Sequence, residues 1–383
     1  MTTLRRLDAL REVPRDAWNA LVGDGSPFLE WDWLSALEES RAVDPECGWL
    51  PQHLTVWEGE RLVGACPTYL KGNSQGEFVF DHHWASAAHR ARLRYYPKLL
   101  VAVPFTPVTG QRFLAAPGMH DDVAGVLAAA LEGLCDGKQV SSAHVNFCPA
   151  DDRSALAARD WLLRTAYQYH WLNHGFSTFD DYLESLRSKR RNQTRREQSA
   201  LAEQGVTIEA LVGDAIPESV FAVMFRLYRH TVDNNPWGNR YLNERFFDLV
   251  RERFRDRLCF IVARRRDRII AGTFNVQKAG VLYGRYWGAF EPLRNLHFNV
   301  CYYAAIAHCI AHGLRRFEPG AGGEFKQLRG FDATETASMH WIGDVRLRAA
   351  IADHLEKERA HVAAEVDWLG EHTALRRDRD DES

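Results

Sequence analysis

The sequence lacks the cysteine pattern of a disulfide-stabilised or zinc-binding protein. Its 7 cysteines are spread over 383 residues, and no two of them have CxxC spacing. An odd, dispersed set of cysteines is typical of proteins from a reducing compartment. Because 46% of the residues are hydrophobic and 26% are charged, we expect a globular fold held by a buried core instead of covalent bridges.

Long apolar runs are also absent. The longest stretches, such as YYPKLLVAVPF, are far shorter than the roughly 20 residues that a membrane-spanning helix needs. The first residues, MTTLRRLDALREVPRDAW, alternate charged and apolar side chains and contain no apolar segment of the kind found in signal peptides. The sequence therefore predicts a soluble cytoplasmic protein.

A strong charge of one sign is missing as well. The formal net charge of −3 at pH 7 excludes a globally basic nucleic-acid-binding protein but allows local basic patches. The sequence contains no GxSxG motif, no P-loop and no GxGxxG between a strand and a helix. Nothing therefore points to the hydrolase, nucleoside triphosphatase or dinucleotide-binding classes that these motifs mark.

What the sequence does contain is an internal repeat. Residues 53–86 predict a strand, a charged turn, a strand, a turn and a strand, and residues 259–290 repeat this order. Glu60–Gly64 aligns with Asp267–Ala271, and each block ends in a tryptophan, Trp84 or Trp287. The alternative is that any two three-stranded meanders look alike, but here the order and the turn positions agree as well as the composition.

Helical patterns precede and follow each block. Ser26 is a candidate cap for a helix that begins at Pro27, and residues 217–254 have apolar side chains at three- and four-residue spacing. Residues 121–137 and 297–313 predict the helices that follow the two meanders.

The pattern indicates an α/β (α+β) fold built from two similar domains, each with a mostly antiparallel sheet flanked by helices. We place the first domain at 1–165 and the second at 166–370, with a helix over roughly 346–370 at its end. Residues 371–383 have no apolar pattern and predict a disordered charged tail.

A basic run follows the predicted helix start at STFDDYLESL. It contributes six cationic candidates for substrate binding: Arg187, Lys189, Arg190, Arg191, Arg195 and Arg196. Because Arg187, Arg191 and Arg195 recur every four residues, they share one helix face and can converge on a phosphate, a diphosphate or an RNA backbone. The alternative is an ordinary solvated helix face, although Glu197 is the only acidic residue close by.

An aromatic and histidine-rich region forms a second candidate set. Tyr95, Tyr96 and Lys98 are predicted to line a groove, and Asp81, His82 and His83 are candidates for acid–base work. We count Asp81 and His82 among the substrate-binding candidates as well. The alternative for most of these aromatic residues is a place in the core. The prolines of VPFTPVTG predict a bulged or edge strand, because proline cannot donate to a β ladder.

Two histidines stand at metal-ligand spacing. His308 and His312 are four residues apart on a predicted helix, but no third ligand or HExxH glutamate accompanies them. We therefore assign them a structural role and predict no metal site.

The stretch FEPGAGGEFKQLRGF, residues 317–331, is the strongest candidate for an active-site edge. Gly320, Gly322 and Gly323 permit positive φ and a close approach of the backbone to a ligand. Such a loop can present N–H groups to an anion or to a developing oxyanion. A mixed-charge surface turn is the alternative.

Three charged residues of this stretch are predicted to be catalytic. Lys326 can add a positive charge beside the loop, and Glu324 or Glu318 can accept a proton from an attacking amine. We count Gly322, Gly323 and Trp287 among the substrate-binding candidates.

Taken together, the quoted segments resemble the FemAB-like branch of the GNAT superfamily. The resemblance runs from SPFLEWDWLSALEES through YYPKLLVAVPFTPVTG and SLRSKRRNQTRREQ to FEPGAGGEFKQLRGF. It implies tandem GNAT-like domains and N-acyltransferase activity. Fem-type relatives transfer an aminoacyl group from aminoacyl-tRNA to an amine of a peptidoglycan precursor, whereas other GNAT proteins use acetyl-CoA.

The resemblance also implies roles for individual residues. GEFKQLRGF is similar to the FKxGFG-type motif of Fem transferases, with Lys326 as its lysine and Gly330-Phe331 as its trailing pair. The basic run is similar to the Arg/Lys-rich helix at which Fem-type enzymes are thought to meet a phosphorylated substrate.

The chain departs from the GNAT pattern at the acyl-donor site. It has no [RQ]xxGx[GA] loop, since EPLRNLHFNVCYY and TPVTGQRFLAAPG occupy the equivalent places. This favours an aminoacyl-tRNA or another acyl donor over acetyl-CoA, with the donor acting as a co-substrate and no permanently bound cofactor. The acceptor is expected to be a small-molecule or nucleotide-linked amine. A non-catalytic module that binds a nucleotide-linked or RNA ligand is the alternative.

Overall fold

The computed structural model describes residues 2–136, 140–235 and 238–376, and the chain divides into two units. Unit 1 comprises Met1–Ala166, Tyr241–Val250 and Glu335–Ala363, and unit 2 comprises Tyr167–Arg240, Arg251–Thr334 and Ala364–Ser383. Neither unit is continuous in sequence, a feature that the repeat did not predict. The ranges 1–165 and 166–370 therefore stay predictions, and most of the predicted tail lies outside the described residues.

Unit 1 contains two groups of strands with helices beside them. Its strands are β1 (Thr2–Leu7), β2 (Trp49–Pro51), β3 (His53–Glu58), β4 (Arg61–Cys66), β5 (Thr68–Lys71), β6 (Lys98–Val101), β7 (Leu114–Ala115), β8 (Ser142–Val145) and most of β15 (Asp332–Ile342). Its helices include α1 (Arg15–Val22), α2 (Trp31–Glu39), α3 (His82–Arg90), α4 (His120–Asp136) and α5 (Ala150–Ala157). The strands follow the orders β1-β3-β4-β7 and β15-β8-β6-β5-β2.

The predicted meander of unit 1 is correct for its hairpin and wrong for its third strand. β3 and β4 pair in antiparallel fashion around the predicted turn at Gly59. Residues 77–81 form no strand, because Phe78 has a φ of 58°, which is incompatible with extended backbone. Trp84 consequently lies on α3 and does not end a strand.

Two further local predictions in unit 1 are corrected by the structure. Ser26 makes no side-chain cap, because Pro27–Leu29 is a single 3-10 turn and the α-helix begins only at Trp31. Residues 104–113 are irregular instead of an edge strand, since Phe105 has a φ of 57° and the flanking prolines supply no N–H to a ladder.

Unit 2 carries the second meander. Its strands are β10 (Val206–Val212), β11 (Leu258–Arg265), β12 (Arg268–Lys278), β13 (Val281–Ala289), β14 (Arg316–Glu318) and the second half of β9 (Leu162–Leu172). Its helical elements include α6 (Phe179–Ser185), α7 (Ser188–Ala202), α8 (Glu218–Asp233), α10 (Leu296–Phe298), the π-helical turn η6 (Asn299–Tyr303), α11 (Ala304–Ala311) and the 3-10 segment η7 (Glu324–Arg329). The unit boundaries fall inside β9, β15, α9 (Glu244–Arg253) and α12 (Val345–Glu371).

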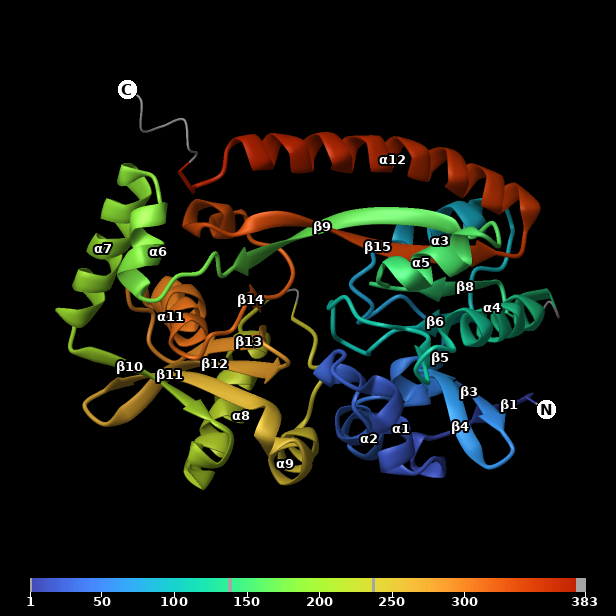
Figure 1. Ribbon diagram of the computed structural model, residues 1–383, viewed down its shortest axis with the longest axis horizontal. Helices are drawn as coiled ribbons and strands as arrows, with labels where there is room; N and C mark the ends of the chain where they lie inside the picture. The colour runs from blue at the N-terminus through green and yellow to red at the C-terminus, as the bar shows by residue number, and fades with distance from the viewer. Residues whose placement is uncertain (1, 137–139, 236–237, 377–383) are drawn as a thin grey trace. The chain divides into compact units, whose positions relative to one another are not determined.

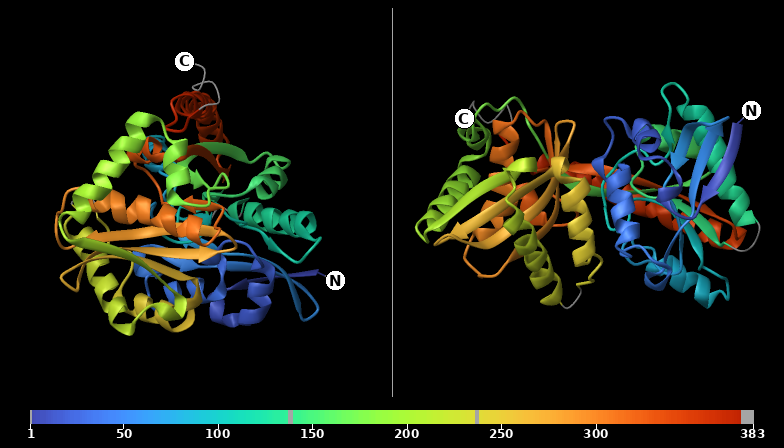
Figure 2. Two further views of the ribbon diagram at one scale, coloured as in Figure 1. Left: turned by 60° about the vertical axis from the view of Figure 1, so that its left-hand side comes forward. Right: turned by 90° about the horizontal axis from the view of Figure 1, so that it is seen from below.

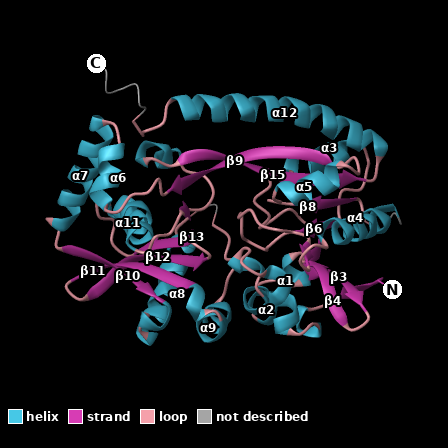
Figure 3. Cartoon of the chain, viewed as in Figure 1, coloured by secondary structure: helices cyan, strands magenta, loops and turns pink. Residues whose placement is uncertain are grey.

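The strands of unit 2 follow the order β10-β11-β12-β13-β14-β9, and the pairs from β10 to β13 are antiparallel as predicted. α8 covers one face of these strands and α11 covers the other (Figure 1). The strands rotate progressively against one another, which gives the sheet its twist (Figure 2). Helices and mostly antiparallel strands alternate in both units (Figure 3), which confirms the predicted α/β class.

Two irregularities mark the middle of the unit 2 sheet. The register of β12 against β13 shifts, so that Phe274 pairs with Tyr286 but Asn275 pairs with Gly284. Such a bulge bends a strand and re-aims its side chains, and bulges often lie next to active sites. β14 runs parallel to β13 but pairs only with residues Val281–Tyr283, so β13 continues beyond the end of its partner.

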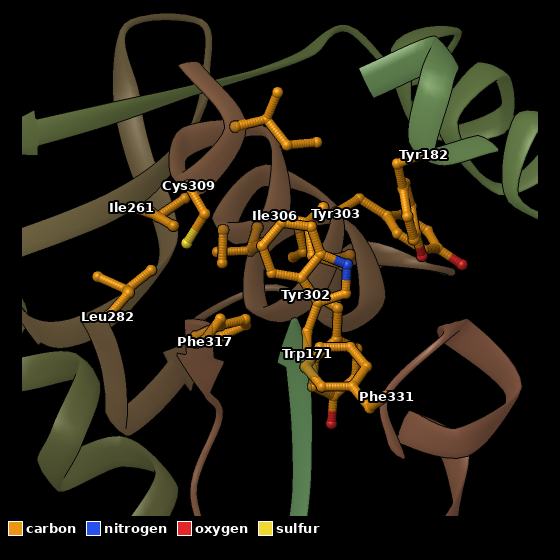
Figure 4. Packing of buried hydrophobic residues seen from close by; sticks show 14 of the residues in the cluster. Trp171, Tyr182, Ile261, Leu282, Tyr302, Tyr303, Ile306, Cys309, Phe317 and Phe331 are labelled. Atoms are coloured by element: carbon orange, nitrogen blue, oxygen red, sulfur yellow. The ribbon is translucent and has the colours of Figure 1, made fainter. Parts of the chain in front are cut away.

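One core cluster of unit 2 lies on the α11 side of the sheet. It is a cluster of buried aromatic and aliphatic side chains that includes Trp171, Tyr182, Tyr302, Phe317 and Phe331 (Figure 4). Phe317 on β14 and Tyr302 on η6 belong to this cluster and also reach a cavity at the bulge. The core therefore fixes two walls of the site described next.

Candidate functional site

A cavity of about 320 Å³ opens in unit 2 where the ladder between β13 and β14 ends. Three groups of residues line it: Thr273, Asn275, Gly284, Arg285, Tyr286 and Trp287 of the meander; His297, Cys301 and Tyr302 of the following helical segment; and Phe317, Pro319, Ala321, Gly322, Gly323, Phe325 and Lys326. Four of the predicted site residues, Trp287, Gly322, Gly323 and Lys326, are therefore brought together.

The backbone of the loop after β14 depends on glycine, as predicted. Gly320, Gly322 and Gly323 have φ values of 93°, 71° and 90°, a region that favours glycine. Gly284 of β13 faces this loop so closely that an added Cβ would lie 3.1 Å from Cα of Pro319. Glycine is thus required on both sides of the point where β13 and β14 separate.

Lys326 lies beside this loop and is almost inaccessible, with 3% of its surface exposed. Its Nζ donates a hydrogen bond to the carbonyl oxygen of Gly320 at 2.6 Å and a second one to that of Gly322. Burial lowers the pKa of Lys326 to about 8. An ammonium group has three N–H donors, so one donor is left for an oxygen atom in the cavity.

The opposite wall of the cavity is aromatic. Trp287 packs edge-on against His297 at 5.1 Å, and His297 packs edge-on against Tyr302 at 5.4 Å. Burial, together with the nearby Arg329 and Lys326, lowers the pKa of His297 to about 4, so the ring is neutral at neutral pH. This wall is shaped to hold an apolar or planar group in a fixed orientation.

The bulge contributes a charged side chain that the sequence did not predict. Arg285 lines the cavity, and its guanidinium lies 5.5 Å from the centre of the Tyr286 ring. Its position follows from the shift in register between β12 and β13, which no pattern in the sequence predicts. Tyr302 and Cys301 were missed for a similar reason, because the π-helical turn η6 changes which side chains face the cavity.

The two predicted catalytic glutamates differ sharply in environment. Glu324 is exposed on η7 and does not belong to the cavity wall. Glu318 is 3% exposed, and burial raises its pKa to about 7 although Arg316 acts in the opposite direction. It is not among the lining residues either, but it lies in sequence between two that are, Phe317 and Pro319, and its Oε1 accepts a bond from Arg316 Nη2 at 2.7 Å.

A buried ion pair holds η7 in place behind the cavity. Arg329 Nη2 donates to both carboxylate oxygens of Glu197 at 3.0 and 3.2 Å, and Arg329 Nε donates to Tyr303 Oη at 2.9 Å. The guanidinium also stacks on Phe298 at 3.6 Å. Glu197, which stood out as the only acid near the basic run, therefore neutralises Arg329 of η7.

The basic run forms α7 in unit 2, as predicted, with Arg187 at its N-cap. Arg187, Lys189, Arg195 and Arg196 are exposed, and Arg190 and Arg191 are partly exposed. Arg191 and Arg195 both bind Glu184 of α6, at 2.8 and 3.2 Å. Within the described ranges, Lys189 and Arg196 form no ion pair. The helix thus keeps a cationic surface despite partial neutralisation.

The aromatic and histidine-rich candidates lie in unit 1, and most are buried. Lys98 Nζ donates to Glu77 at 2.8 Å and also to Asp81, which accepts a further bond from Tyr95 Oη at 2.5 Å. Tyr96 Oη bonds to Ser74, and His82 is exposed at the start of α3. Lys98, Asp81 and Tyr95 form a charge network inside the unit, because a buried ammonium needs carboxylate partners.

The paired histidines hold no metal-like arrangement. The rings of His308 and His312 lie 4.2 Å apart, and His308 Nε2 bonds to Gln277 at 3.0 Å. Over residues 2–136, 140–235 and 238–376, no group of three His, Cys, Asp or Glu side chains is placed to hold a metal ion. None of the helices in these ranges combines the length and apolar character that crossing a bilayer requires.

A family model described as peptidoglycan biosynthesis/recognition, FemAB-like, matches residues 9–377 of the chain. A search of curated proteins finds no match. The fold is similar to FemX, with a TM-score of 0.54 and 11% identity over 86% of this chain and 96% of that one. It is also similar to L-PGS from Bacillus licheniformis, with a TM-score of 0.52 and 7% identity over 94% and 100% of the two chains.

A third similar structure is the C-terminal domain of a putative lysylphosphatidylglycerol synthetase from Agrobacterium fabrum. Its TM-score is 0.53, and its identity is 10% over 89% of this chain and 95% of that one. At these identities, the structures show a shared fold and nothing finer.

Proposed function

This chain belongs to the FemAB-like family and is an acyltransferase, and from that premise we propose that it transfers an aminoacyl group from aminoacyl-tRNA to an amine of a peptidoglycan precursor. The proposed place of reaction is the cavity of unit 2. One observation carries the proposal: Lys326 is buried at a glycine loop, has no carboxylate partner among the described residues, and keeps a donor for an oxygen atom in the cavity.

Lys326 is suited to stabilise a developing oxyanion. Attack on an acyl carbonyl moves negative charge onto its oxygen, and a donor in a water-poor site stabilises that charge more strongly than water does. Two carbonyl groups, those of Gly320 and Gly322, hold the Lys326 ammonium in place before the substrate arrives. The site therefore needs little reorganisation as the charge forms.

Glu318 is the proposed general base. A carboxyl group with a pKa of about 7 is partly ionised at neutral pH and can take a proton from an ammonium. The freed nitrogen then bonds to the acyl carbon, and the ester bond to the tRNA ribose breaks. The ribose oxygen takes a second proton from the nitrogen, and Glu318 returns its proton to solvent. The net products are an amide, a ribose hydroxyl and one proton.

Aminoacyl-tRNA is favoured as donor for two reasons. Residues 291–295, which precede α10, contain no glycine, and Asn295 adopts a φ of 65° before a helical start that passes into the π turn η6. This geometry differs from a glycine-rich loop that leads into a regular helix and binds a pyrophosphate. The cationic α7 offers contacts to an RNA backbone instead. An acyl-CoA is the alternative donor.

The direct test is a transfer assay with the full chain. Purified protein is mixed with labelled aminoacyl-tRNAs or acyl-CoAs and a lysine-containing peptidoglycan stem peptide, and the peptide product is identified by mass spectrometry. Transfer from aminoacyl-tRNA that is lost in Lys326→Met supports the proposal. If transfer occurs only from an acyl-CoA, the donor is acyl-CoA and not aminoacyl-tRNA. Binding of tRNA without any product supports the non-catalytic alternative.

A further inference from the structure

Next to the proposed base lies a histidine that the sequence patterns did not single out. His170 on β9 is 6% exposed, and its Nε2 lies 3.8 Å from Oε2 of Glu318 on β14. β9 and β14 are paired antiparallel neighbours, and Phe317 pairs with Trp171. The next residues along the two strands, Glu318 and His170, therefore lie across from each other on the same face of the sheet.

Both facing atoms lack a hydrogen-bond partner. Among the residues the structure describes, neither Oε2 of Glu318 nor Nε2 of His170 has a bond, although both are buried. Buried polar atoms are nearly always hydrogen-bonded. Two unbonded atoms that face each other therefore indicate a binding site for a third group that bonds to both. The separation of 3.8 Å is too long for a direct bond between them.

The neighbouring side chains determine the hydrogen-bonding roles of Glu318 and His170. Oε1 of Glu318 is already occupied by Arg316, which leaves Oε2 as the available carboxylate oxygen. Burial and the positive charges of Arg316 and Lys326 lower the pKa of His170 to about 3, so its ring is neutral. Tyr283 faces the same cluster from β13, and burial with the nearby Glu318 raises its pKa to about 12. A neutral imidazole has one nitrogen that accepts a hydrogen bond.

We infer that Glu318 and His170 together form the seat of the acceptor nitrogen, which donates one N–H to Oε2 of Glu318 and another to Nε2 of His170. This inference rests on the proposed function and adds His170 to it as a positioning residue. A nitrogen at roughly 2.9 Å from both atoms lies to one side of the line that joins them and bridges the two. An amine or ammonium carries the two donors that the pair requires, whereas a hydroxyl group carries only one. The site therefore selects an amine acceptor over a hydroxyl acceptor.

The test compares two peptides that differ in one atom. One is a stem peptide with lysine, and the other carries 6-hydroxynorleucine, in which a hydroxyl replaces the amine. Binding to the full-length wild type, measured without donor, is expected to be at least tenfold tighter for the lysine peptide, the size expected for a hydrogen bond to a charged group. In His170→Leu this preference is expected to shrink to about threefold or less, while His170→Gln, which keeps an acceptor oxygen, retains part of it.

A second readout does not depend on a folded variant. In ¹⁵N NMR of the wild type, the His170 ring nitrogens are expected to shift on addition of the lysine peptide and not on addition of the hydroxynorleucine peptide. His174→Gln is the matched control variant and should behave as the wild type. Equal binding of the two peptides, or an unchanged preference in His170→Leu with an unmoved ring signal, overturns the inference.

The two proposals fail in different ways. If the wild type transfers no acyl group from any donor, the proposed function fails, but the binding and NMR comparisons still report on the pair. If transfer occurs equally well to both peptides, the proposed function stands and the assignment of His170 falls.

Discussion

Two buried lysines, one in each unit, show how partners decide the character of the same side chain. Lys98 in unit 1 is 0% exposed and donates to the carboxylates of Glu77 and Asp81. Lys326 in unit 2 is 3% exposed and donates to two backbone carbonyls. The neighbouring carboxylates raise the pKa of Lys98 against the effect of burial, whereas burial lowers that of Lys326 to about 8.

On the proposed function, this difference separates a structural charge, that of Lys98, from a reactive one, that of Lys326. Two carboxylates hold the charge of Lys98 inside a closed network, in which burial raises the pKa of Glu77 to about 7. Carbonyl dipoles hold Lys326 in position without neutralising it, and its charge is therefore available to a new anion beside the cavity. Each of the following predictions breaks or sharpens this comparison.

The largest effect is expected from Lys98→Met. Removing the ammonium leaves Glu77 and Asp81 buried without a counter-charge, which destabilises a fold by about 3–5 kcal/mol. The free energy of unfolding, measured by urea denaturation at pH 8, should fall by that amount. The loss should be smaller at pH 5, where the two carboxyls can take up protons.

Lys326→Met should give the opposite outcome: a folded protein with little activity. In the part of the chain that the structure describes, the side chain pairs with no carboxylate, so its removal leaves no buried charge without a partner. Loss of an oxyanion donor typically lowers kcat by about 10²–10³-fold. The measurement is kcat in the transfer assay together with the unfolding free energy of the same preparation.

Lys71 provides the matched control for this pair of variants. It is buried in unit 1, its Nζ lies 3.6 Å from the Trp49 ring centre, and burial lowers its pKa to about 7. If a low pKa alone made a lysine catalytic, Lys71→Met would also abolish transfer. We expect kcat to stay within about threefold of the wild type, and a loss as large as that of Lys326→Met would contradict the comparison.

The sequence predicted the surroundings of Lys326 better than those of Lys98. Lys326 was identified because a glycine-rich turn precedes it and because the segment resembles a known motif, and both features are local in the chain. Lys98 was assigned to a groove, since its partners Glu77 and Asp81 lie 17 or more residues away and meet it only in the folded unit. Local patterns report turns and helices, but they do not report which distant charges converge.

The same reasoning explains what was found and missed elsewhere. The second meander and the helices α8 and α11 were predictable, because periodicity and turn chemistry act within a few residues. The positions of Arg285 and His170 were not predictable, since one depends on a bulge and the other on the pairing of β9 with β14. The positive φ of Phe78, which prevents the third strand predicted for residues 77–81, has no marker in the sequence.

The pH dependence of transfer should show both titrating groups of the site. Glu318, the proposed base, works only when deprotonated, so kcat/KM should rise with pH through about 7. Lys326 works only when protonated, so kcat/KM should fall as pH rises through about 8. In Glu318→Gln, kcat/KM should be much lower than in the wild type and should no longer increase with pH. In Lys326→Arg, the decrease in kcat/KM should occur at higher pH. A flat profile from pH 6 to 9 would contradict both assignments.

The two lysines should also differ in how they couple stability to pH. The pKa of Lys326 is lowered from its ordinary 10.5 to about 8, so between these values the unfolded state binds more protons and stability rises with pH. The pKa of Lys98 is raised, so its contribution is complete below 10.5 and is lost as pH rises through the folded value. Urea denaturation of Lys326→Met from pH 7 to 10.5 should lack the rise that the wild type shows.

The smallest effects are expected on the surface of α7, where the same distinction between paired and unpaired cations recurs. Arg191 and Arg195 share Glu184, whereas Lys189 and Arg196 form no ion pair within the described ranges. A cation without a partner has more to gain from an RNA phosphate, because it gives up no existing pair. Lys189→Ala and Arg196→Ala should therefore each raise KM for aminoacyl-tRNA by about two- to fivefold and reduce the slope of log affinity against log salt by roughly 0.7–0.9. Arg195→Ala removes one of the two cations that pair with Glu184 and leaves Arg191 bound to it, so we expect a KM increase of similar size from the loss of one positive charge. If all three single variants kept the wild-type KM and salt dependence, aminoacyl-tRNA would have to bind elsewhere than on α7.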